Sequence, residues 1–217
     1  MIEGTVKLLL AGATGGTGAT LLDQALAAGH EVTVVARHPE RVRPQDHRML
    51  TLVRGDVLED GPWRAAAAGH EVALSCLGST DRKKPTTVYS RGTLNVLEAM
   101  GESPARRLIC LSSGGLDISP DTSFGQRVVT KLVIQRMYRY GYQDMTRMET
   151  LIGRQDVRWT IVRAPMLTDN PATGEYRTAV GTHVPGAKSI SRADLARYML
   201  TAIDDSTTWK TTVEISR

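Results

Sequence analysis

A glycine-rich loop near the start of the chain constrains the fold more than any other feature. The loop reads Gly12-Ala13-Thr14-Gly15-Gly16-Thr17-Gly18. The apolar run at residues 6–11 is typical of a buried parallel strand, and residues 17–28 have the apolar spacing of a helix that ends at Gly29. Glycines at positions 12, 15 and 18 permit a tight turn, the close approach of a ligand, and close packing of the helix on the sheet.

This strand-loop-helix pattern also indicates what the loop binds. Backbone N–H groups at the start of a helix favour an anion such as a pyrophosphate. Because a β-branched strand at residues 32–36 follows the helix, the loop has the context of a dinucleotide-binding unit. A plain structural turn is the alternative, and a P-loop is excluded because no Gly-Lys-Ser/Thr follows. The predicted cofactor contacts in the loop are Gly12, Thr14, Gly15, Gly16, Thr17 and Gly18.

Strand-like and helix-like segments alternate along the rest of the chain. Further strands are predicted at residues 50–53, 72–77, 108–112 and 159–163, and further helices at residues 88–100 and 193–203, the last with Ser191 as its N-cap. This alternation predicts an α/β fold, a doubly wound and mostly parallel (Rossmann) sheet in a single domain over residues 1–217. We expect the acceptor site to form from the segments after the fourth to sixth strands and from residues 117–142.

Composition narrows the class of protein. The 217 residues are 41% hydrophobic and 23% charged, as in ordinary globular proteins, and no apolar run reaches the length of a membrane span. The N-terminus does not look like a signal peptide. The cysteines Cys76 and Cys110 are too few for a disulfide framework, and both are expected to be inert buried thiols of a cytoplasmic protein. The net charge of +4 is compatible with a nucleic-acid partner, an anionic cofactor, or neither.

The end of the second strand predicts the choice of cofactor. NAD-preferring sites usually carry Asp or Glu there, whereas this chain has Arg37. An arginine can bind the 2′-phosphate of NADP, with Arg41 as a second cation, so NADP(H) is predicted. The alternative is that both are solvated surface arginines. Five arginines between residues 37 and 54 outnumber the two acids there, so the basic surplus favours a phosphorylated dinucleotide over nucleic acid.

Further cofactor contacts are expected at the carboxyl ends of the next strands. Asp56, followed by Val57, is placed to accept a hydrogen bond from the adenine amino group, although a helix cap is a serious alternative for Asp56. The segment Leu77-Gly78-Ser79 would pass beside the middle of the cofactor.

Two common kinds of catalytic chemistry are missing. None of the six tyrosines has a lysine four residues later, so the Tyr-x-x-x-Lys proton donor of many short-chain reductases is absent. The five histidines show no metal-binding spacing, and we expect no metal. His30, His38, His47 and His70 lie beside turn-like residues and are expected at the surface. The run at residues 137–142 holds three tyrosines that could stack a planar acceptor, but a partly exposed packing face is favoured.

Several segments together resemble one family over nearly the whole chain. They are the glycine loop, Arg37 with Arg41, Gly55-Asp56-Val57-Leu58, Leu77-Gly78-Ser79 with Pro85-Thr86-Thr87-Val88, and residues 169–176 and 190–195. The chain resembles the atypical short-chain dehydrogenases with an NAD(P)-binding NmrA-like fold, and among them the biliverdin reductase B/flavin reductase type. The resemblance implies NADPH-dependent hydride transfer to flavins, quinone-like acceptors or linear tetrapyrroles.

The resemblance also implies roles for individual residues. The active-site serine of the family falls on Ser113, with Ser112 and Pro165 beside the cofactor and Met166 and Leu167 beside the acceptor. Met166 stands where the family type has a histidine, which disfavours tetrapyrroles more than flavins or quinones. Ser112 and Ser113 could instead cap a following turn.

Two other classes of function compete with a reductase. NmrA-like regulators bind NADP without turning it over and act on a partner protein. A nucleic-acid binder is unsupported by any motif. We expect a small-molecule acceptor as the partner, neither nucleic acid nor membrane, and a monomer over an oligomer.

Overall fold

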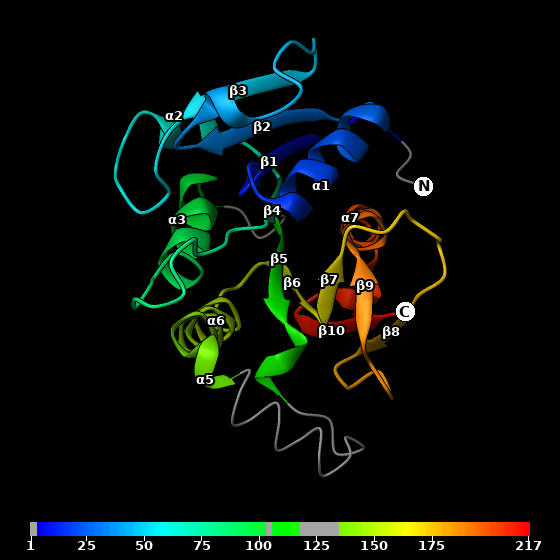
Figure 1. Ribbon diagram of the computed structural model, residues 1–217. Helices are drawn as coiled ribbons and strands as arrows, with labels where there is room; N and C mark the ends of the chain where they lie inside the picture. The colour runs from blue at the N-terminus through cyan, green and yellow to red at the C-terminus, as the bar shows by residue number, and fades with distance from the viewer. Residues whose placement is uncertain (1–3, 103–105, 118–134) are drawn as a thin grey trace.

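One eight-stranded sheet forms the centre of the computed structural model, which describes residues 4–102, 106–117 and 135–217 (Figure 1). Its strand order is β3-β2-β1-β4-β5-β6-β10-β8. The strands are β1 (Lys7–Ala11), β2 (Glu31–Ala36), β3 (Leu50–Arg54), β4 (Val72–Ser75), β5 (Arg107–Ser113), β6 (Arg158–Ala164), β8 (Arg177–Val180) and β10 (Thr211–Ser216). Each pair is parallel except β10 with β8. The order reverses between β1 and β4, where ligands of such sheets bind.

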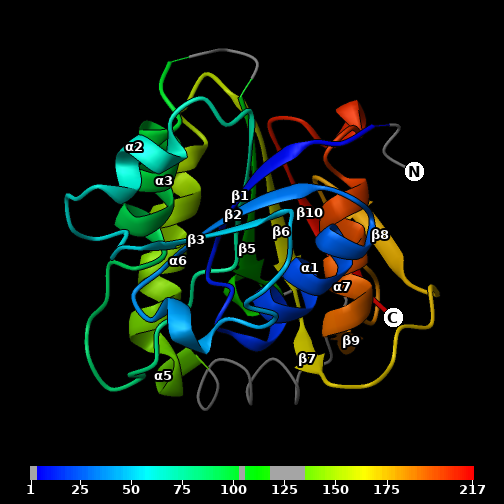
Figure 2. The ribbon, with the colours of Figure 1, turned by 90° about the horizontal axis from the view of Figure 1, so that it is seen from above.

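Helices cover both faces of this sheet (Figure 2). The helices α1 (Gly16–Ala27) and α7 (Arg192–Thr201) lie on one face, and α2 (Trp63–Ala67), α3 (Ser90–Ala99) and α6 (Arg139–Ile152) lie on the other. Because successive strand residues point to opposite faces, Leu8 and Leu10 of β1 pack with α1 and α7, while Leu9 packs with α3 and α6. From Leu8 to Ala11 the central strand is therefore apolar, as a segment buried on both faces must be.

Short elements complete the fold. A separate parallel pair is formed by β7 (Met166–Thr168) and β9 (Ser189–Ser191). Short helical turns lie at η1 (Pro39–Arg41), η2 (Gly114–Leu116), α5 (Gln135–Met137) and η4 (Ser206–Thr208). No helix among the described residues is long and apolar enough to cross a membrane.

The Rossmann prediction is confirmed, and most of its elements are where the pattern put them. The six predicted strands correspond to β1 to β6, and the three predicted helices to α1, α3 and α7. Gly29 has a φ of +83° after α1, and the Ser191 hydroxyl caps α7 by accepting from the Asp194 N–H at 3.0 Å. Of the stretch at residues 117–142, residues 118–134 lie outside the described residues, and α6 begins within the rest.

The expectation that His30 lies at the surface is wrong. His30 is 2% exposed, and its Nδ1 accepts a hydrogen bond from the backbone N–H of Val6 at 3.3 Å. Burial lowers the pKa of His30, while Asp204 raises it in part. His38 is exposed, and His47 and His70 are partly exposed. Turn-like residues beside a histidine therefore do not show that it is exposed. Here the turn that contains His30 packs against the residue before β1, and the side chain is buried.

A buried arginine joins the sheet to α7 at the end opposite the glycine loop. Arg107 is 3% exposed, and its guanidinium donates to the carbonyl oxygens of Ala202 at 2.7 Å and Ile203 at 3.1 Å. It also donates to the Arg158 carbonyl oxygen at 2.9 Å. Burial lowers the pKa of Arg107 to about 10.

Candidate dinucleotide-binding site

Two glycines of the loop after β1 are fixed by packing within the protein. Gly12 has a φ of +90°, and a Cβ there would collide with the carbonyl oxygen of Cys76. A Cβ on Gly18 would collide with the carbonyl oxygen of Gly12. These two glycines let the loop lie against the end of β4 and let α1 lie against the loop.

Gly15 is not explained in this way. Its φ is −88°, and the nearest atom to a Cβ there would be the Gly12 carbonyl oxygen at 3.5 Å, an ordinary contact. Gly15 is the N-cap residue of α1, whose first turn has no side-chain cap and no acidic residue. The first N–H groups of α1 therefore remain available to an anion, and Gly15 leaves its approach open.

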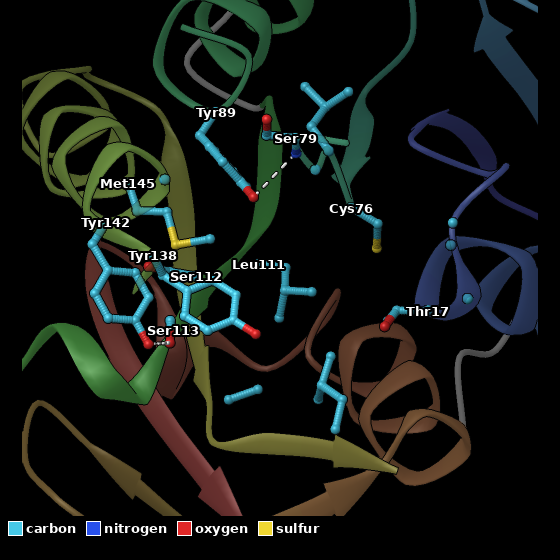
Figure 3. A pocket seen from close by; sticks show the side chains of 18 of the residues that line it. Thr17, Cys76, Ser79, Tyr89, Leu111, Ser112, Ser113, Tyr138, Tyr142 and Met145 are labelled. Carbon is cyan, nitrogen blue, oxygen red and sulfur yellow. Dashed lines mark hydrogen bonds between the residues drawn. The ribbon is translucent and has the colours of Figure 1, made fainter. Parts of the chain in front are cut away.

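Two adjoining cavities cross the carboxyl ends of the strands at this point. The first, here called the Arg37 cavity, has a volume of about 430 Å³ and is lined by Gly12, Thr14, Arg37, Asp56 and Val57 among others. The second, the tyrosine cavity, has a volume of about 470 Å³ and is lined by Tyr89, Tyr138 and Tyr142, with Thr17 across from them (Figure 3). Both are bordered by Gly15, Cys76, Leu77, Gly78, Ser79 and Asp81, so they form one groove.

The Arg37 cavity contains one of the two predicted arginines. Arg37 directly follows β2 and is exposed at the cavity. Arg41 is also exposed but does not line either cavity. Arg54 pairs with Glu40 at 3.0 Å and donates to the Arg37 carbonyl oxygen at 3.0 Å, so it supports the backbone of Arg37. Arg37 is therefore the arginine best placed to meet a ligand in this cavity.

Asp56 closes a turn at the same cavity. Its Oδ1 accepts from the Leu58 N–H at 2.9 Å, whereas α2 begins only at Trp63. The alternative that Asp56 caps the next helix is therefore wrong, although its carboxylate does organise the local backbone. Its place in the lining leaves the carboxylate available to a ligand, and Val57 beside it is buried.

The tyrosine cavity has an aromatic wall from the tyrosine run at residues 137–142, which lies in the stretch expected to contribute to the acceptor site, although a partly exposed packing face was favoured for these tyrosines. Tyr138 and Tyr142 are separated by one turn at the start of α6, and their rings stack with centroids 6.1 Å apart. The Arg82 guanidinium lies 4.8 Å from the centre of the Tyr138 ring. The Tyr89 hydroxyl accepts from the Ser79 N–H at 3.1 Å (Figure 3). The helical register of α6 turns the tyrosines toward the cavity, which their sequence alone did not reveal.

Ser112 and Ser113 end β5 at the floor of this cavity. Ser113 accepts from the Gly115 N–H at 3.2 Å and donates to the Tyr142 hydroxyl at 3.4 Å (Figure 3). A Cβ on Gly115 would lie 2.5 Å from that tyrosine hydroxyl, so this glycine makes room for it. Ser113 therefore caps the turn, as the alternative reading held, and still lines the cavity beside Tyr142.

Ser112 is oriented by a partly buried ion pair. Its hydroxyl is buried and donates to Glu149 at 2.7 Å. Arg163 donates to both carboxylate oxygens of Glu149, at 3.1 and 2.6 Å. Hydrogen bonds to Glu149 and the nearby charges of Glu149, Asp117 and Glu214 raise the pKa of Arg163 against its burial. Glu149 and Arg163 thus fix the end of β5 against α6.

Successive side chains in the segment after β6 point to opposite sides. Pro165 and Leu167 line the tyrosine cavity, but Met166 is 68% exposed and lines neither cavity. The predicted acceptor contact by Met166 is therefore not supported by its position.

Other groups complete the lining. Cys76 lies between the cavities, and burial raises the pKa of its thiol to about 12, as expected for an inert thiol. Arg192 reaches the tyrosine cavity from α7, more than a hundred residues after the glycine loop. Its spacing in the sequence does not predict a place in the site. Among the described residues, no group of His, Cys, Asp and Glu is arranged to hold a metal ion.

Comparisons with known proteins agree with this geometry. Residues 12–206 match a family model described as NAD(P)H-binding. An uncharacterized chloroplastic protein of Arabidopsis thaliana is 26% identical over 178 residues, which cover 78% of this chain and 62% of that protein. An uncharacterized protein of Mycobacterium tuberculosis is 29% identical over 109 residues, covering 50% of this chain and 12% of that one. The chain thus spans under two thirds of these relatives.

Solved structures show the same fold. A short-chain dehydrogenase/reductase of Veillonella parvula, in complex with NADP, has a TM-score of 0.79 at 18% identity, over 99% of this chain and 95% of that one. A proposed NADH-flavin reductase of Streptococcus pneumoniae has a TM-score of 0.75 at 18% identity, over 98% of this chain and 100% of that one. With a family model matching most of its length, and a Rossmann sheet bearing the glycine loop, the chain belongs to the NAD(P)H-binding family.

Proposed function

We propose that the protein is an NADPH-dependent reductase that transfers hydride to a flavin, a quinone-like compound or a related conjugated acceptor. One observation carries this proposal. The glycine loop, which suits a dinucleotide, shares a groove with a cavity walled by tyrosines, which suits a flat conjugated molecule. The two ligands would then meet above the ends of β4 and β5.

The residues of the groove fit a dinucleotide. The open N-terminus of α1 suits its pyrophosphate, and Asp56 suits an amino group of its adenine. Arg37 stands where NAD-preferring proteins carry an acid, so it supports NADP(H) over NAD(H). The neighbour from Veillonella parvula, which holds NADP in the same fold, is consistent with this choice.

The protein's own contribution to the reaction would be orientation. The nicotinamide supplies the hydride when it is bound. The backbone at Leu77, Gly78 and Ser79 would hold the middle of the dinucleotide, and Tyr89 fixes this segment through the Ser79 N–H. Tyr138 and Tyr142 would stack against the flat acceptor and fix its orientation. Binding the dinucleotide and the acceptor side by side would supply proximity.

The lack of a strong proton donor among the described residues of the site suits reduction of a flavin or quinone better than reduction of a ketone. Tyr142 and Ser113 share a hydrogen bond, but Thr146 stands four residues after Tyr142, where a lysine would assist proton transfer. Reduction of an isoalloxazine or a quinone leaves an anion that water can protonate. These acceptors therefore need little acid catalysis from the site.

An acceptor screen tests the proposal. NADPH oxidation is followed by the loss of its near-ultraviolet absorbance, with FMN, riboflavin and menadione offered in turn. We expect turnover with at least one of them. If the protein binds NADPH tightly but no acceptor promotes its oxidation, the result contradicts a reductase and supports a cofactor-sensing regulator that acts on a partner protein.

A further inference from the structure

The backbone conformation of the loop does not require a glycine at position 16. Gly16 is the first residue of α1, and it is not among the glycines with a positive φ. Alanine is a better helix former than glycine at such a position. The reason for Gly16 must therefore lie in what occupies the space beside it.

That space is filled by the side chain of Arg192. A Cβ on Gly16 would lie 2.7 Å from Arg192 Nε and 2.9 Å from its Cδ. Arg192 therefore crosses directly over the Cα of Gly16, at the first turn of α1. Any larger residue at position 16 would displace the arginine from the loop.

The arginine is also held from its own side. Arg192 is the first residue of α7, where the Ser191 hydroxyl accepts from the Asp194 N–H at 3.0 Å and donates to the Asp194 carboxylate at 2.8 Å. Its Nη1 pairs with Asp169 Oδ1 at 2.6 Å. The Arg192 side chain is 27% exposed, whereas that of Asp169 is 90% exposed. Three features thus fix the position of Arg192: the start of α7, the ion pair with Asp169, and the space left by Gly16, which has no side chain.

Two positive groups meet at this point, and the one acid paired with Arg192 is exposed to solvent. The N-terminus of α1 carries the positive end of the helix dipole, and a cation beside it is unfavourable. The first turn of α1 has no acidic residue, and Asp169 is a solvent-exposed counter-charge. An anion bound between α1 and Arg192 would satisfy both positive groups.

We propose that Arg192 binds the pyrophosphate of the dinucleotide, and that Gly16 is a glycine in order to admit it. The proposal rests on the dinucleotide lying over the glycine loop, as proposed above. The planar guanidinium can donate two hydrogen bonds to phosphate oxygens while the N–H groups of α1 bind the other side. The pyrophosphate is then held by a side chain from α7 as well as by the loop.

Equilibrium titration with NADPH tests the role of Arg192. Removing a charge-assisted contact in Arg192→Gln is expected to raise the Kd for NADPH about tenfold to a hundredfold, and Arg192→Lys to raise it less. Arg197→Gln is the matched control, because Arg197 is exposed on the same helix and lines neither cavity. It is expected to bind NADPH like the wild type. All variants are first compared by thermal denaturation.

Fragments of the cofactor locate the contact. 2′-Phospho-ADP-ribose keeps the pyrophosphate but lacks nicotinamide, and it should lose as much affinity as NADPH in Arg192→Gln. 2′-AMP lacks the pyrophosphate and should lose none. An unchanged Kd for 2′-phospho-ADP-ribose, or an equal loss for 2′-AMP, would contradict the pyrophosphate contact.

A double-mutant cycle tests the link to Gly16. Gly16→Ala displaces Arg192, so it should raise the Kd for NADPH, and the double variant should bind no worse than Arg192→Gln. Additive losses would mean that Gly16 serves the ligand directly, and the link would be wrong. Absence of NADPH binding by the wild type would instead contradict the proposed function itself.

Discussion

The hydroxyl of Ser113 lies 3.4 Å from the hydroxyl of Tyr142, and the two residues are 29 positions apart in the chain. Ser113 ends β5, and Tyr142 lies in the first turn of α6. The contact forms because α6 packs beside β5 and because Gly115 carries no side chain that would displace the tyrosine. It places two hydroxyl groups side by side on the wall where the acceptor is proposed to bind.

Removing the Tyr142 hydroxyl should slow reduction of the acceptor. Tyr142→Phe keeps the ring but removes the contact with Ser113, so we expect kcat/KM for the acceptor to fall about tenfold, in steady-state assays with NADPH saturating. Tyr140→Phe is the control, because Tyr140 is on the same helix and does not line the cavity. Equal activity of Tyr142→Phe and the wild type would exclude a role for this hydroxyl.

Ser113→Ala should have a related effect. It removes both the cavity hydroxyl and the cap on the Gly115 N–H, and we expect a loss of kcat/KM of about tenfold or more. Because the two hydroxyls are in contact, the losses in Ser113→Ala and Tyr142→Phe should not add in the double variant. Unchanged turnover of Ser113→Ala with the best acceptor would remove Ser113 from the mechanism.

Arg37 should determine the preference for NADPH. Arg37→Gln removes the cation at the Arg37 cavity, so the Kd for NADPH should rise about tenfold to a hundredfold while that for NADH changes little. Arg41→Gln is the matched control, since Arg41 is exposed outside both cavities. Parallel titrations with the two nucleotides measure the ratio. A wild type that prefers NADH would contradict the prediction.

His30 should make the protein less stable in mild acid. The unfolded chain binds a proton at the ordinary histidine pKa of about 6.5, whereas burial lowers the pKa in the folded protein. Protonation therefore favours unfolding, and stability present above pH about 6.5 is lost as the pH falls toward the lowered pKa. Urea unfolding across this range should show a smaller loss in His30→Gln. The exposed variant His38→Gln should keep the wild-type dependence, and an unaltered dependence in His30→Gln would contradict the assignment.

Arg107 should contribute strongly to stability. Arg107→Met leaves the carbonyl oxygens of Ala202, Ile203 and Arg158 without the guanidinium, so we expect the free energy of unfolding to fall by about 3 kcal/mol or more. Arg154→Met, at an exposed position, should change it by less than about 0.5 kcal/mol. Similar denaturation midpoints for the two variants would contradict this role.

The sequence predicted the parts of the fold that depend on local pattern. The glycine loop and the alternation of apolar strands with amphipathic helices identify strands β1 to β6, because each such unit is specified within about 30 residues. The edge strand β8 has little burial and no apolar alternation, so nothing in its sequence distinguishes it from a loop. Arg37 and Asp56 reach their cavity because they come within two residues of the ends of neighbouring strands, β2 and β3, whose ends meet at one edge.

The rest of the site depends on contacts between distant segments. Tyr138 and Tyr142 line the cavity only because α6 packs against α3 and β5, and Arg192 does so only because α7 lies beside α1. Met166 is a predicted contact that packing turns away from the site. Successive side chains of β7 point to opposite sides, so Met166 points outward and its neighbour Leu167 points into the cavity. Such choices are made by tertiary packing, and a single sequence does not display them.

Single-turnover hydride transfer tests the central claim most directly. The protein is loaded with NADPH, or with NADPH deuterated at C4 of the nicotinamide, and mixed rapidly with the acceptor that performs best in the screen. We expect acceptor-dependent oxidation of the bound NADPH, slowed by deuterium on one face of the ring. Bound NADPH that is not oxidised by any flavin or quinone would contradict a reductase.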